Sequence, residues 1–453
     1  MAPKPEPAIG GRRPAERRRS PREERAADIR IPTTADAHGT GDTAGARANR
    51  LPLYALLAAS IVSLVGNTLT LVALPWFVLQ TTGSPVRTGL TGFFIALPNF
   101  LAGLFGGTLV DRLGPKRVGI AADLVSGVGI VLIPALYLTV GLAFWQLLAL
   151  VFLGATLDVP GLTARRALLP ELATLARMPL ERVNAAFEGL QYVAQLLGPP
   201  LAGLLIAALG ASNVLWIDAA TFAFSAALVA VAIPAATLGE RPKAGRYLDD
   251  LLDGFRFLVR DRTLLALALG LTITNFLGAP LFAVLWPVYV RDTGGAATGL
   301  GLLAAAFGGG SLLGAAVYGA IGHRLPRRPI WIGAYMVEAL PLWTLALTGS
   351  LPVILAVTAL CATLGGPLSP LGVTIRHERT PPHLRGRVFG TFSALATAGS
   401  PLGMLAGGFA LEGLGLRATL VAMGAAYLAV GTGMLFVPAL RGMDRPAREP
   451  PAG

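Results

Sequence analysis

A compact charged turn interrupts a very apolar part of the sequence at residues 106–119, which read GGTLVDRLGPKRVG. Basic residues alone would suffice to hold a loop on one side of a membrane, whereas a carboxylate near lipid is costly. We therefore interpret Asp111 as a residue that contacts another part of the protein, while Gly114 and Pro115 make the turn. The charged residues of the turn are Asp111, Arg112, Lys116 and Arg117.

Four polar residues form a second group within the apolar segment 182–209. Asn184, Glu188, Gln191 and Gln195 follow one another at steps of four, three and four residues, which places them on one face of a helix. A polar stripe facing lipid would be unstable, so it faces either a cavity or another helix. We favour the cavity and predict that all four contact a substrate, with Glu188 also a candidate to carry a proton.

Further polar candidates lie in other apolar segments. Asn67 and Asn275 occupy matching positions in two segments and are predicted to bind substrate. Glu338 is the most deeply placed acid and suits either proton transfer or a structural hydrogen bond. Asp123 and Asp218 lie nearer helix ends and are expected to pair locally.

Asp158 comes two helical turns before Arg165 and Arg166, at the predicted cytoplasmic end of its segment. Such an acid could form a charge relay with Asp111 and carry a proton. The alternative is a carboxylate at a helix end that is exposed to water. Both interpretations stay open at this point.

Several aromatic residues could supply walls for an amphipathic compound. Because aromatic side chains near helix ends are more often anchors at the membrane interface, we expect that role for them instead. These residues are Trp76, Phe93, Phe94, Trp286 and Tyr289.

The composition identifies the kind of structure that must position these residues. The 453 residues are 54% hydrophobic and 14% charged, and a membrane-spanning helix needs about 20 mostly apolar residues. The absence of period-two alternation favours helices over a barrel, which predicts an all-α membrane protein with twelve spans. The predicted spans are residues 53–79, 88–110, 117–139, 142–163, 182–209, 213–234, 263–290, 298–321, 329–348, 351–374, 387–411 and 417–438.

The basic residues predict the orientation of these spans. If both termini are cytoplasmic, all but three of the 37 Lys and Arg residues lie on the cytoplasmic side, as such residues do in membrane proteins. The three exceptions are Arg87, Arg291 and Arg417. The charges are spread over loops without interleaved aromatic residues, so nucleic-acid binding is disfavoured.

The chain divides into two related halves. Laying GTLVDRLGPKR, from Gly107, over GAIGHRLPRRP, from Gly319, aligns Arg112 with Arg324, which indicates a duplicated bundle. We predict a disordered Arg/Pro-rich cytoplasmic tail at 1–50, bundles of six helices at 51–236 and 263–438, and a cytoplasmic tail at 439–453. An amphipathic linker at 237–262 is expected to lie on the cytoplasmic surface.

The charged turn also carries a family resemblance. The pattern of Gly107, Asp111, Arg112, Gly114, Lys116 and Arg117, placed between the second and third spans, resembles motif A of the major facilitator superfamily. The resemblance implies that Asp111 acts as a latch. It would cap the positive N-terminal end of the eleventh helix, near Arg387, while the transporter is open to the outside.

A second resemblance narrows the branch of this superfamily. Ala194, Gly198, Pro199 and Gly203 resemble motif C of the antiporters, with alanine in two glycine positions; ordinary close packing is the alternative. Together with WIDAATF (216–222) and LRGRVFG (384–390), the pattern resembles the enterobactin-exporter and macrolide-efflux branch. One departure is that the fourth span has no arginine before Arg165, which puts the usual arginine of proton coupling in doubt.

These resemblances imply an inner-membrane exporter of amphipathic drug-like or siderophore-like molecules, acting as a monomer by proton antiport. A metabolite importer or uniporter of the same fold, and a non-transporting membrane sensor or scaffold, are the alternatives. No catalytic triad, carboxylate pair or metal-site spacing suggests an enzyme, and no cofactor is expected. Each of the three lysines follows a proline, so the sequence has no P-loop for ATP.

Overall fold

The computed structural model describes residues 49–234 and 247–444, and this part of the chain contains helices and no strands. Residues 1–48 of the predicted N-terminal tail and residues 445–453 of the predicted C-terminal tail lie outside the described residues. Eleven helical stretches there are long and apolar enough to cross a membrane. The remaining predicted span, 88–110, lies within α3, a helix of 29 residues. The chain is thus an all-α membrane protein with the twelve predicted spans.

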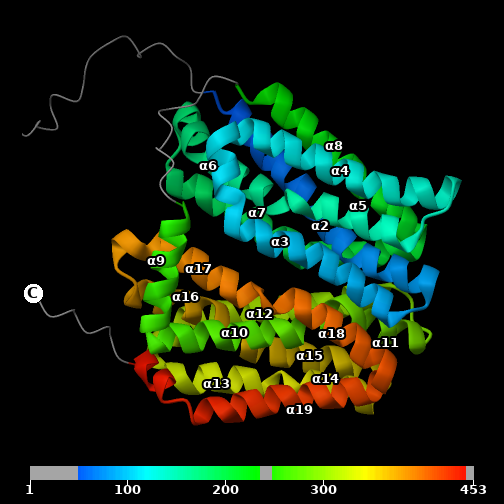
Figure 1. Cartoon of the computed structure of the whole chain (residues 1–453), viewed down its shortest axis with the longest axis vertical. Helices are drawn as coiled ribbons and strands as arrows, with labels where there is room; N and C mark the ends of the chain where they lie inside the picture. Colours follow the sequence, from blue (N-terminus) through cyan, green and yellow to red (C-terminus); the bar gives the residue numbers. More distant parts are fainter. Residues whose placement is uncertain (1–48, 235–246, 445–453) are drawn as a thin grey trace, which may run out of the picture. The chain divides into compact units, whose positions relative to one another are not determined.

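The first half forms one bundle, in which α2 packs on α7 and α8, and α4 packs on α8 (Figure 1). Its fourth span is broken at Leu157 into two helices. The helices are α2 (Leu51–Thr82), α3 (Pro85–Leu113), α4 (Pro115–Thr139), α5 (Phe144–Thr156), α6 (Asp158–Ala176), α7 (Leu180–Leu209) and α8 (Ala211–Ala232).

The second half forms the other bundle, in which α10 packs on α18, α12 on α15 and α14 on α19. Its spans contain several breaks, including a π-helical turn, η1. The elements are α10 (Arg262–Pro280), η1 (Leu281–Leu285), α11 (Trp286–Asp292), α12 (Thr298–Ile321), α13 (Arg327–Val337), α14 (Ala339–Leu347), α15 (Leu351–Gly365), α16 (Leu368–Arg379), α17 (Arg385–Thr397), α18 (Gly399–Leu414) and α19 (Leu416–Leu435).

Part of the predicted linker forms α9 (Tyr247–Arg260), which packs on α17 (Figure 1). Gly254 allows this contact, because a Cβ there would lie 2.6 Å from the carbonyl oxygen of Arg387. Leu258 is fully buried, whereas Leu252, Phe255 and Val259 are exposed. Residues 235–246 of the predicted linker lie outside the described residues.

The fourth span is longer than predicted. It continues past residue 163 as α6 to Ala176, where Arg177 adopts a positive φ of 51° and ends the helix. The sequence predicts an earlier end because two adjacent arginines normally mark the start of a loop. The helix continues because Arg165 is neutralised by a buried acid on a neighbouring helix, so Asp158 lies near the middle of the span and not at its end.

The two halves contact each other mainly where α3 packs on α18 and α7 packs on α12, with smaller contacts of α3 with α17 and η1 and of α2 with α11 and η1. We call the loops at 113–115, 322–327 and 379–385 the basic end, and the loops at 83–85, 139–144, 292–298, 348–350 and 414–416 the opposite end. Toward the opposite end, one apolar core includes buried residues of both halves, among them Phe77, Val78, Val284 and Leu285.

Candidate substrate cavity and buried charges

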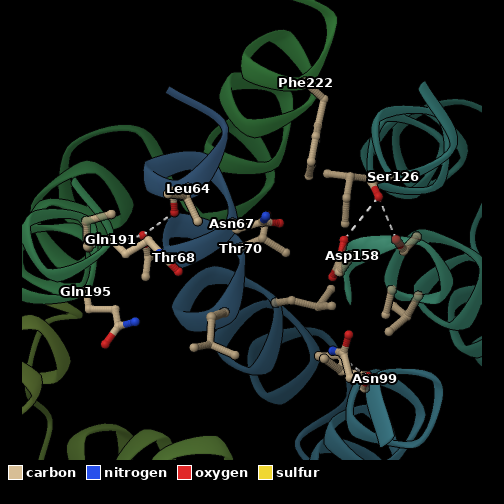
Figure 2. Close-up of a pocket in the computed structure, with 18 residues that line it drawn as sticks. Leu64, Asn67, Thr68, Thr70, Asn99, Ser126, Asp158, Gln191, Gln195 and Phe222 are labelled. Carbon is tan, nitrogen blue, oxygen red and sulfur yellow. Dashed lines mark hydrogen bonds between the residues drawn. The ribbon is translucent and has the colours of Figure 1, made fainter. Parts of the chain in front are cut away.

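A polar pocket of about 290 Å³ lies inside the first half and is lined by residues of all its helices from α2 to α8 (Figure 2). Asp158 is the only ionisable residue among the described residues that line it. The break at Leu157 makes Asp158 the first residue of α6, where the helix dipole favours a negative charge. The Ser126 hydroxyl donates to Asp158 Oδ1 at 3.2 Å and also lies 2.7 Å from the Gly154 carbonyl.

Two asparagines add hydrogen-bonding groups to this pocket. Asn99 Nδ2 donates to the Ile95 carbonyl at 3.2 Å, and its Oδ1 is buried without a hydrogen-bond partner in the part of the chain that the structure describes. Asn67 lines the same pocket from α2. A buried amide oxygen without a partner is costly, so the pocket offers an acceptor that a ligand could satisfy.

A larger cavity, about 890 Å³, lies between the two halves. Its described lining is mostly apolar and includes no Asp, Glu, Lys, Arg or His. Thr68, Leu71 and Gln195 line both this cavity and the polar pocket, so the two spaces adjoin. The aromatic residues of the larger cavity are Tyr192, Phe282, Trp286 and Phe307.

The expected interfacial role of the aromatic residues is wrong for three of them. Trp76, Trp286 and Tyr289 are each at most 6% exposed and belong to the core shared by the two halves. Trp286 packs edge-on against Phe282 and Phe307 at the cavity wall. Their position near helix ends suggested anchors, but the packing of the two halves against each other buries these ends.

A buried ion pair joins α4 and α6 next to the polar pocket. Arg165, 6% exposed, pairs with Asp123, 3% exposed. Ser225 of α8 donates to the second oxygen of Asp123 at 2.7 Å, and Arg165 also contacts the hydroxyl of Ser63 at 3.1 Å. Asp123 therefore pairs with residues of other helices, and the prediction that it pairs locally is wrong.

This ion pair changes the interpretation of Asp158. Arg165 pairs with Asp123 and Arg166 with Glu188, so neither arginine forms an ion pair with Asp158. The carboxylate of Asp158 is also not at a water-exposed helix end, because it lies in the middle of a span. Its predicted relay with Asp111 falls outside the described residues, because the structure describes neither the surroundings of Gly107 nor the side chain of Asp111.

The polar stripe of α7 divides between two environments. Gln191 and Gln195 line the polar pocket, whereas Asn184 is exposed. Glu188 forms a half-exposed ion pair with Arg166 at 2.9 Å and accepts a hydrogen bond from Gln191 Nε2 at 3.0 Å. The structure thus places Gln191 and Gln195 at the polar pocket, and Asn184 and Glu188 nearer the basic end.

The two candidates in the second half lie away from both cavities. Asn275 Nδ2 donates to the Ala396 carbonyl of α17 at 2.8 Å, which joins two helices. Glu338 lies at the break between α13 and α14, and a Cβ on Gly365 would come within 3.1 Å of its Oε1. Neither residue is among those lining the two spaces.

Asp218 is a fully buried acid whose partners the sequence did not predict. Thr70 of α2 donates to one of its oxygens, and Thr221 of its own helix donates to the other at 3.1 Å. Only the second contact is local, as expected. Gly66 of α2 faces this carboxylate directly, because a Cβ there would overlap both Asp218 and Thr221.

The described part of the charged turn has the expected backbone. Gly114 adopts φ 86°, which confirms the need for glycine at this position. Lys116 Nζ donates to the Ala230 and Ile233 carbonyls at the end of α8, where a cation also favours the helix dipole. Arg112 and Arg117 are exposed.

The small residues of α7 make close helix contacts, which both the antiporter motif and ordinary packing would give. Gly198 faces Thr68 of α2, and Thr68 Oγ1 donates to the Ala194 carbonyl at 3.4 Å. A Cβ on Gly203 would lie 3.0 Å from the Cα of Gly301 on α12, across the boundary between the halves. Pro199 lines the larger cavity.

Among the described residues there is no group of three or more His, Cys, Asp or Glu side chains that could hold a metal ion. Cys361 is buried and unpaired.

Comparison with known proteins identifies the family of this fold. The model of the family described as transmembrane secretion effector matches residues 50–452. The chain belongs to this family, which is part of the major facilitator superfamily of membrane transporters. It is 33% identical over 405 residues to the multidrug efflux pump Tap of Mycolicibacterium fortuitum, covering 87% of this chain and 98% of that protein.

More distant relatives agree with this assignment. The chain is 24% identical to macrolide efflux protein A of Streptococcus pyogenes, over 81% of this chain and 91% of that one. Two solved structures share the fold. One is the nucleoside transporter NupG, with a TM-score of 0.67 and 12% identity, covering 85% of this chain and 98% of that one. The other is a bacterial homologue of the human lysosomal transporter Spinster in an inward-facing conformation, with a TM-score of 0.65 and 17% identity, covering 88% of this chain and 98% of that one.

Proposed function

We propose that this transporter exports amphipathic small molecules from the cytoplasm, in exchange for protons. The observation that carries the proposal is the pair of adjoining spaces: a large, aromatic-lined cavity between the halves, and a polar pocket with one carboxylate. Ligand sites commonly combine a mostly apolar wall with a few polar groups that fix orientation. The efflux function of the Tap and macrolide pumps supports the direction.

The charge of the polar pocket supports a substrate with an amine. Asp123 and Arg165 neutralise each other, which leaves Asp158 as the uncompensated charge of the pocket lining. The apolar body of a substrate would occupy the larger cavity, and a protonated amine would reach Asp158 and the acceptor oxygens of Asn67 and Asn99. A neutral or anionic analogue would leave that carboxylate unpaired or repelled.

For proton exchange, Asp158 is the strongest of the three acids named from the sequence. It faces the substrate pocket, whereas Glu188 is already paired with Arg166 and Glu338 lies outside both cavities. A carboxylate that binds either an amine or a proton couples the two movements, because only one can be bound at a time. Alternating access around a site near the middle of the membrane would complete the exchange.

The basic end is proposed to face the cytoplasm, with both termini on that side of the inner membrane. The packed core at the opposite end then closes the path to the outside, so the structure is closed externally. The cavity would be loaded from the cytoplasm in this state, as export requires.

The proposal is tested by drug susceptibility and by transport with purified protein. A host that expresses the chain should resist some members of a panel of antibiotics and siderophores, and proteoliposomes should move the same compounds against a gradient when a pH difference is imposed. Asp158→Asn should abolish the pH dependence, while Glu181→Gln, an exposed acid outside the cavities, should not. Movement in the opposite direction would indicate an importer, and no movement at all a sensor or scaffold.

A further inference from the structure

The short loop between α2 and α3, at the opposite end, is held by two charged residues of the second half. The Gly83 carbonyl accepts a hydrogen bond from Arg291 Nη1 of α11 at 3.1 Å. On the other side of the loop, Glu412 Oε2 of α18 accepts hydrogen bonds from the Ser84 hydroxyl at 3.0 Å and from the Val86 amide at 3.4 Å. We call these three contacts the clasp.

The clasp matches the charges of the two helix ends that it holds. Gly83 caps the C-terminus of α2, where free carbonyls carry partial negative charge and favour a cation. Ser84 caps the N-terminus of α3, where free amides favour an anion. Asp292 holds the guanidinium of Arg291 in place at 2.8 Å. Each charged residue therefore meets the helix end of opposite sign.

The position of Glu412 repeats that of Asp111. Asp111 lies two residues before Leu113, the last residue of α3, and Gly114 follows; Glu412 lies two residues before Leu414, the last residue of α18, and Gly415 follows. α3 and α18 pack against each other and run in opposite directions. Glu412 thus contacts the first turn of the helix that ends with Asp111.

We propose that the clasp is an external latch, which stabilises the externally closed state and must break before the cavity opens outward. The geometry assigns to Glu412 a role at the opposite end that corresponds to the role expected of Asp111 at the basic end. The two latches would alternate, because Asp111 would join the second span to the eleventh at the basic end, and Glu412 joins the same two spans at the opposite end. This inference rests on the alternating access of the proposed function.

The test measures the separation of the two halves at the opposite end without any substrate, so it does not depend on transport. Spin labels are attached at Val140→Cys and Gly349→Cys, both exposed at that end in different halves, with Cys361→Ala as background. Pulsed electron resonance then gives the distribution of distances in the purified full chain. Gly408→Leu serves as the positive control, because a side chain there would clash with Pro85 and Gly89 of α3 and separate the halves.

Glu412→Ala should increase the ratio of open to closed molecules by roughly two- to fivefold, the size expected for partly exposed charge-assisted contacts. Ser84→Ala should give a smaller change. The double variant should raise the open-to-closed ratio by less than the product of the two single effects, because both substitutions remove the same contact. Arg417→Gln, an exposed basic residue at the same end, is the matched control and should change nothing. An unchanged distribution in Glu412→Ala, with Gly408→Leu shifted, would overturn the proposal.

Discussion

Arg165 and Asp123 form an ion pair in the interior of the first half, where neither side chain is more than 8% exposed. The pair joins α4 to α6, and serines from α2 and α8 complete it. Four helices therefore depend on one charge pair that lies beside the substrate pocket.

Breaking this pair should destabilise the protein strongly. Asp123→Asn or Arg165→Met leaves one charge buried without its partner, which costs about 3–5 kcal/mol. We expect a clearly lower Tm for the detergent-solubilised protein in either single variant. Asp123→Leu combined with Arg165→Met should recover much of the loss, since it leaves no unpaired charge. A double variant that is less stable than both single variants would contradict this explanation.

Gly66→Ala should also lower the Tm. Its new methyl group would overlap the Asp218 carboxylate and the Thr221 side chain, so α2 and α8 would have to separate. Gly119→Ala is the matched control, because nothing lies within 4 Å of its Cβ position, and it should keep the Tm or raise it slightly through better helix propensity. Equal effects of the two substitutions would show that contact with Asp218 is unimportant.

The two parts of the binding region should be separable with one pair of fluorescent probes, dansylcadaverine, which carries an amine, and its neutral N-acetyl derivative. Phe307→Ala removes aromatic surface from the larger cavity and should weaken binding of both compounds by a similar factor. Asp158→Asn should weaken only the amine, by roughly tenfold or more. The measurement is the change in dansyl emission on titration, and equal loss of both probes in Asp158→Asn would exclude the proposed amine site.

Gly203→Val should impair transport more than folding. The larger side chain would meet the Ala297 carbonyl and the Cα of Gly301 on α12 and keep the halves apart at this crossing. We expect loss of drug resistance with normal amounts of protein in the membrane. Gly189→Ala on the same helix has free space around its Cβ and should transport like the unaltered protein. Normal transport by Gly203→Val would mean that this crossing can relax.

The spans and the fold class were predictable because a membrane-spanning helix needs a long apolar run. The family patterns at Gly114 and Gly203 were recognisable because their residues are close together in the sequence. The length of the fourth span was not predictable, because charged residues normally end a span. Arg165 stays inside the helix only because Asp123, 42 residues earlier, approaches it in three dimensions. No local pattern carries that information.

Contacts between residues far apart in the sequence also explain which site residues could not be predicted. The helical periodicity of α7 correctly grouped Gln191 and Gln195, but it could not show that Glu188 turns toward Arg166 instead. The clasp of Glu412 with Ser84 joins residues 328 positions apart, so sequence spacing gave no signal. The resemblance between the ends of α3 and α18 was present in the sequence, yet it becomes meaningful only when the two helices lie side by side.

The crossings between the halves have a consequence for the speed of the transport cycle. At Gly203 with Gly301, and at Gly89 with Gly408, main chain meets main chain. Large side chains that interlock must change rotamer before two helices can separate. Two glycine surfaces can move past each other without such a change. Enlarging any of these four glycines would therefore slow the cycle, while the residues that line the two cavities would stay the same.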